Sequence, residues 1–201
     1  MVNCWWSIGW GGHILQIIAT CAVEIIAVIV PLLALTANQM AKIEEALQDC
    51  GSVSAVHLDE LSSAAINGKA IPRMHEIGYH SESTMFIFTS PQKIANNHAM
   101  LGTLVMCHAR QTLRLVTIYE THLYAQHGNT FRGERRLLSA LFLSVIFKIG
   151  SWHPLFLVMT ATMTIPLLTA LSNLTHFDWT NKNHQLWVNA KTSSRGILRG
   201  P

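Results

Sequence analysis

Glu24 is the acidic residue whose surroundings in the sequence most strongly suggest a chemical role. It lies within residues 11–37, where the only other charged or imidazole side chain is His13. A carboxyl group midway along an apolar membrane helix must be protonated, paired, or exposed to a polar cavity. Thr20 and Cys21 would lie one helical turn earlier, so the three residues form a candidate intramembrane polar site. Such a site would either hydrogen-bond a neighbouring helix or handle ions, and both interpretations stay open.

The chain has eleven histidines, and two of them have a spacing that suggests a bound group. His108 and His122 would share one helical face, and their separation resembles that of the axial ligands in di-haem cytochrome b helices. Each haem needs a second histidine from a facing helix, and no other segment offers such a pair. We therefore predict no cofactor and no metal, with haem or metal bound through His108 and His122 as the alternative.

Catalytic motifs are absent from the sequence. It has no GxGxxG, GxxxxGK[ST], GxSxG or HExxH stretch, the patterns that hold phosphates, a nucleophile or a catalytic metal. Cys107 precedes His108, but adjacent helical residues point about 100° apart, so a thiolate–imidazole pair is not expected. We predict no catalytic residues and no enzymatic activity.

The composition indicates a membrane protein. Half of the residues are hydrophobic and only 12% are charged, against about 25% in an average soluble domain. The formal net charge is +3, and the lysine and arginine residues form no dense run. We therefore expect no contact with nucleic acid and predict the lipid bilayer as the main partner.

Three stretches are expected to cross the bilayer as helices. Residues 14–35 exceed the roughly 20 apolar residues that a span requires. Residues 137–174 are hydrophobic apart from one interruption at residues 148–154, which predicts a helical hairpin. The predicted fold class is an all-α integral membrane protein with about three transmembrane helices.

The region between these spans is expected to be mostly helical and outside the membrane. Ser90 followed by Pro91 predicts a helix start, because serine caps free amides and proline fits the first turn. Apart from Gly102 no breaker occurs before Gly128, so one long helix over residues 91–127 is favoured. Its heptad-spaced face would contact another helix. The predicted helix–helix contact residues are Ile94, Leu101, His108, Leu115 and His122.

These elements divide the chain into four segments. They are an N-terminal segment with the first span (1–37), an extramembrane region (38–133), a hydrophobic hairpin (134–174) and a polar tail (175–201). Within the extramembrane region, residues 84–89 alternate weakly and are compatible with a short strand, although no partner strand is predicted.

The distribution of positive charge predicts the orientation in the membrane. Thirteen of the fourteen lysine and arginine residues lie between the first span and the hydrophobic run that begins at residue 137, or in the tail, and Lys148 is the exception. The positive-inside rule places these segments in the cytoplasm or the organelle matrix, and the N-terminus outside. The predicted location is a bacterial inner membrane or an organelle inner membrane.

The function predicted from these features is that of a structural or accessory subunit. The chain would join a larger membrane complex, or copies of itself, through helix–helix contacts. The alternative is an ion-conducting or proton-driven unit that uses Glu24. The order of one span, a large inner region and two spans is similar to that of the ExbB/TolQ stator family, although no motif of that family matches this sequence residue by residue.

Overall fold

The computed structural model shows an α/β protein. It describes residues 24–30, 37, 40, 41, 45, 53–59, 62, 64–77, 83–119, 142, 145, 146, 154–158, 165, 166, 169, 172 and 173. In chain order, the elements within this part are β1 (Ile25–Ile29), β2 (Val53–Leu58), α3 (Ala64–Glu76), β3 (Thr84–Thr89), α4 (Pro91–Asn96), α5 (His98–Ala109), β4 (Leu113–Ile118) and β5 (Leu155–Val158).

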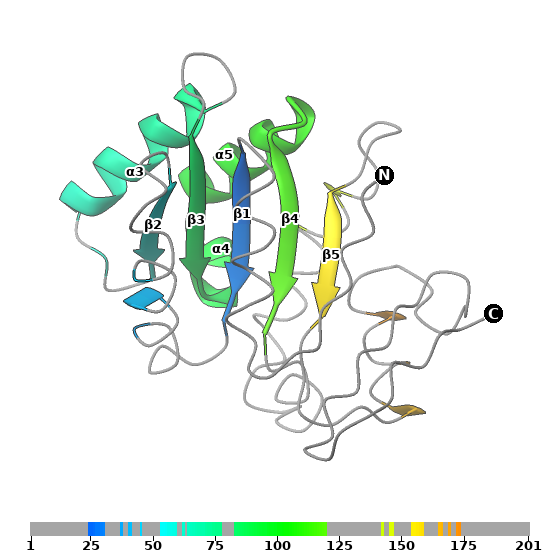
Figure 1. The fold of residues 1–201 in the computed structure, drawn as a ribbon. Coiled ribbons are helices and arrows are strands. Elements are labelled where there is room, and N and C mark those ends of the chain that lie inside the picture. The colour runs from blue at the N-terminus through cyan, green and yellow to red at the C-terminus, as the bar shows by residue number, and fades with distance from the viewer. Residues whose placement is uncertain are drawn as a thin grey trace.

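The five described strands form one parallel sheet in the order β2-β3-β1-β4-β5 (Figure 1). The central strand β1 pairs with β3 on one side and with β4 on the other. Every residue of β1 and of β3 is buried. Strands that are covered on both faces of a parallel sheet are continuous apolar runs, and the segments IIAVI and MFIF fit this pattern.

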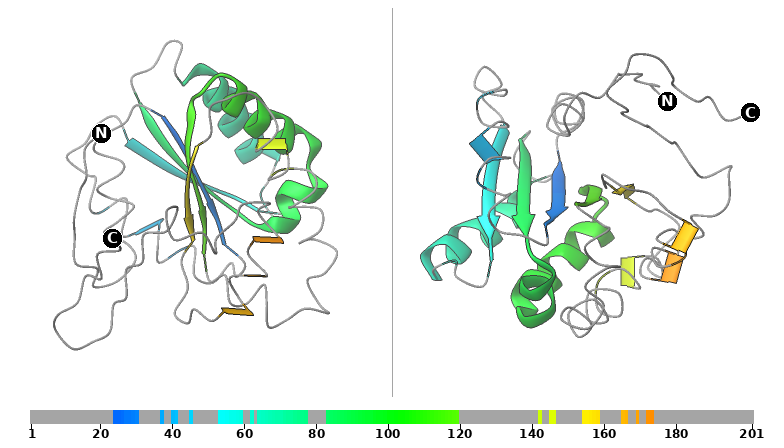
Figure 2. Two further views of the ribbon diagram at one scale, coloured as in Figure 1. Left: turned by 90° about the vertical axis from the view of Figure 1, so that its right-hand side faces the viewer. Right: turned by 90° about the horizontal axis from the view of Figure 1, so that it is seen from below.

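The three described helices lie on one face of the sheet (Figure 2). Met74 of α3, Ile94 of α4 and Leu104 of α5 pack with Ile87 of β3 in one core cluster. Phe88 of β3 belongs to a second cluster, because successive side chains of a strand point to opposite faces. The sheet therefore separates two apolar layers.

The helix start at Ser90 and Pro91 is confirmed. The Oγ of Ser90 accepts a hydrogen bond from the backbone N–H of Lys93 at 2.9 Å, and Pro91 occupies the first turn of α4. The short strand over residues 84–89 is also confirmed as β3, and its partners are β1 and β2. Local signals were sufficient at this strand–helix junction.

The long helix predicted over residues 91–127 is wrong. Asn97 is extended, with φ −113° and ψ 96°, and its side chain caps a new helix by accepting from the N–H of Met100 at 2.9 Å. The chain then turns at Gln111, whose φ of 61° is in the left-handed region, and enters β4. Two helices and a strand occupy residues 91–118 instead, and residues 120–127 lie outside the described residues.

The all-α membrane fold with three transmembrane helices is also wrong. Within the predicted first span, residues 25–29 form the central strand of the sheet, and within the predicted hairpin, residues 155–158 form β5. No described helix has both the length and the apolar character that a membrane crossing requires. Most other residues of these spans lie outside the described residues. The prediction failed because a buried parallel strand is as continuously apolar as a membrane helix.

Candidate ligand site at the carboxyl edge of the sheet

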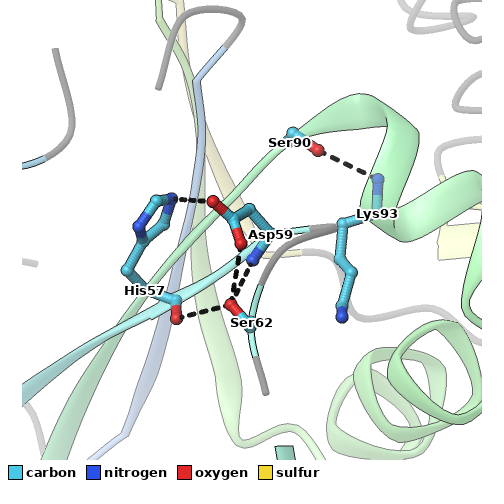
Figure 3. Close-up of polar contacts among 5 residues, drawn as sticks. All are labelled: His57, Asp59, Ser62, Ser90 and Lys93. Atoms are coloured by element: carbon cyan, nitrogen blue, oxygen red, sulfur yellow. Dashed lines mark hydrogen bonds and ion pairs between the residues drawn. The ribbon is translucent and has the colours of Figure 1, made fainter. Parts of the chain in front are cut away.

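The carboxyl ends of β2 and β3 lie side by side. The strand register pairs Leu58 with Thr89, so the residues that follow them, Asp59 and Ser90, are neighbours at this edge. Ligands of open parallel α/β sheets bind outside the carboxyl ends of the strands. Polar side chains from both strand ends gather there (Figure 3). We call His57, Asp59, Ser62, Ser90 and Lys93 the carboxyl-edge site.

Ser62 holds the carboxylate of Asp59. The backbone N–H of Asp59 donates to the Oγ of Ser62 at 2.8 Å, and the Ser62 hydroxyl lies 2.9 Å from Oδ1 of Asp59. The same hydroxyl lies 3.3 Å from the carbonyl oxygen of His57. On the other side of the carboxylate, Oδ2 lies 3.7 Å from Nε2 of the His57 ring (Figure 3).

Lys93 brings a positive charge to the site from the first turn of α4. The Ser90 cap fixes the turn from which this side chain extends. Lys93 is only 5% exposed, a degree of burial that lysine almost never shows unless its ammonium is paired. Within the described part of the chain, no salt bridge joins Lys93 to an acidic side chain. An anionic ligand is one counter-charge that the ammonium of Lys93 can bind.

The arrangement suits binding better than nucleophilic catalysis. An ammonium group and nearby hydroxyls are donors that phosphate oxygens accept, whereas a carboxylate and an imidazole are ligands for divalent cations. A serine nucleophile would need contact with its imidazole base. Here the Ser62 hydroxyl contacts Asp59 and not the His57 ring.

Glu24 lies at the opposite edge of the sheet, directly before β1. Its Oε1 accepts a hydrogen bond from Nε of Arg114, and the two side chains form an ion pair. Burial raises the pKa of Glu24, while the hydrogen bond and charge of Arg114 lower it. Thr20 and Cys21 lie outside the described residues, so the predicted three-residue site stays untested.

The predicted helix–helix contact residues do not share one helix. Ile94 is in α4, Leu101 and His108 are in α5, and Leu115 is in β4. His122 lies outside the described residues, so the prediction of no cofactor and its alternative, haem or metal bound through His108 and His122, both stay untested.

The sequence reasoning missed all five residues of the carboxyl-edge site. A usable signal was present, because Asp59 and Ser90 each follow directly after a six-residue strand. That signal points to a shared site only if β2 and β3 are known to be neighbouring parallel strands. The sequence analysis places residues 56–58 in a mostly helical extramembrane region, so it does not pair the two segments.

Comparisons with known proteins identify the fold. No protein-family model and no curated protein matches this chain. Among solved structures, it resembles the DUF1998 helicase MrfA bound to DNA and AMPPNP, with a TM-score of 0.58, 20% identity, and coverage of 81% of this chain and 21% of that chain. It also resembles the DUF1998 helicase MrfA, with a TM-score of 0.51, 19% identity, and coverage of 82% and 24%. The chain thus spans less than a quarter of the length of these helicases.

This likeness corrects the remaining membrane-based predictions. The accessory-subunit function, the ion-conducting alternative, the bilayer and membrane subunits as partners, and the integral-membrane location are wrong, because the fold is that of part of a helicase. The prediction that excludes nucleic acid is contradicted as well, because one of the similar solved structures is a helicase bound to DNA. The chain therefore has the fold of a segment of the DUF1998 helicase MrfA.

Proposed function

We propose that this chain is a helicase-like α/β domain that binds nucleic acid, with backbone phosphate held at the carboxyl-edge site. The observation that carries this proposal is the position of Lys93, a lysine 5% exposed at the carboxyl end of β3 and without a salt bridge to a described acidic residue. The likeness to a helicase bound to DNA and AMPPNP supports a phosphate-bearing ligand.

Lys93 and Ser90 would bind the phosphate. The ammonium of Lys93 provides the positive charge, and the Ser90 cap keeps the first turn of α4 in place beneath it. The described stretch 83–119, which contains Lys93, has no acidic residue. Phosphate neutralisation by such cations supplies most of the sequence-independent affinity for nucleic acid.

Nucleic acid is preferred to a nucleoside triphosphate as the ligand. AMPPNP is bound in the helicase structure, but the present sequence has no GxxxxGK[ST] stretch, whose backbone amides and lysine cradle the phosphates of a nucleotide. We therefore propose that these residues bind nucleic acid without hydrolysing ATP, in agreement with the absence of a catalytic motif.

Fluorescence anisotropy with a labelled single-stranded DNA oligonucleotide tests this proposal. Lys93→Met keeps the apolar stem and removes the charge, so DNA affinity should fall and the slope of log K against log salt should shrink by about 0.7. Lys69→Met, on the exposed surface of α3, should bind like the wild type. The proposal fails if the wild type does not bind DNA. It also fails if Lys93→Met binds DNA as tightly as the control Lys69→Met.

A parallel assay separates the two phosphate ligands. Binding of AMPPNP and release of phosphate from ATP are measured with the same wild-type protein, with and without the oligonucleotide. We expect DNA binding without ATP hydrolysis. ATP hydrolysis that is lost in Lys93→Met would instead assign the site to a nucleotide and overturn the choice of nucleic acid.

A further inference from the structure

We draw no further inference here: the strongest candidate, the outward face of α5, where Ala99, Gly102 and Ala109 are exposed on a helix without lysine, arginine or acidic residues, is an apolar helix face, and nothing in the described part of the chain shows what covers it.

Discussion

Arg114 on β4 forms an ion pair with Glu24, the residue directly before β1, at the amino edge of the sheet. The two residues are 90 positions apart in sequence and are joined because β1 and β4 are neighbouring parallel strands. The Glu24 side chain is 11% exposed, whereas that of Arg114 is 47% exposed. Burial therefore acts mainly on the carboxylate.

This asymmetry predicts how stability depends on pH. Burial raises the pKa of Glu24 above its ordinary value despite the opposing effect of Arg114. The folded protein then holds the proton more tightly than the unfolded chain does. The Glu24 contribution to the free energy of unfolding is present below the ordinary carboxyl pKa and is lost as pH rises through the raised pKa. Urea unfolding between about pH 4 and 8 measures this loss.

Substitutions of Glu24 and Arg114 test whether this ion pair causes the pH dependence of stability. Glu24→Gln should remove this part of the pH dependence, because no carboxyl remains to titrate. Arg114→Gln removes the hydrogen bond and charge that lower the pKa of Glu24, so the loss should become larger and extend to higher pH. Lys69→Gln on the exposed surface of α3 serves as the control. The same pH profile in wild type and Glu24→Gln would contradict the prediction.

Cys107 is predicted to be unreactive in the folded protein. It is 1% exposed within the core cluster, and burial raises the pKa of its thiol to about 11. The thiolate fraction near pH 8 is then on the order of 0.1%, and the thiolate is the reactive form. Alkylation at pH 8, followed by peptide mass mapping, should leave Cys107 unmodified.

The same reaction in concentrated urea is the control for Cys107. Unfolding exposes the thiol and returns its pKa to the ordinary range, so Cys107 should then be alkylated quickly. Fast modification of Cys107 under native conditions would show that α5 does not pack against the sheet as described.

Phe88 is predicted to be one of the most sensitive core positions. It is fully buried in β3, next to the central strand, and Val28 of β1 pairs with it. Phe88→Ala should lower the free energy of unfolding by about 3–5 kcal/mol, because the substitution leaves a cavity in the apolar layer. Urea or thermal unfolding followed by circular dichroism measures the change.

Ile66→Ala is the matched control for Phe88. Ile66 is 44% exposed on α3, and surface substitutions usually change stability by less than about 0.5 kcal/mol. Equal effects of the two substitutions would contradict the buried parallel sheet.

The sequence by itself determined those elements that depend on neighbouring residues. Ser90 and Pro91 marked the start of α4, because capping and the fixed proline φ act within one turn. The weak alternation of residues 84–89 was compatible with the short strand β3, although it predicted no partner strand. These predictions held because the physical cause lies inside the segment that it shapes.

Only the tertiary structure decided what residues 25–29 are. An isolated apolar run favours a membrane helix and a buried parallel strand equally, since both are surrounded by apolar groups. The choice depends on pairing with β3 and β4, whose sequences lie about 60 and 90 residues further along the chain. Four of residues 25–29 are β-branched, which favours a strand, but the partner strands are not specified within the segment.

The candidate site depends on tertiary structure for the same reason. Asp59 and Ser90 are neighbours because Leu58 and Thr89 are in register at the ends of neighbouring strands. Likewise, Glu24 was singled out as a carboxyl in an apolar stretch, but its partner Arg114 is supplied by β4. Residue types and local turns follow from the sequence, whereas the partners of buried charges follow from strand order and register, which are properties of the whole sheet.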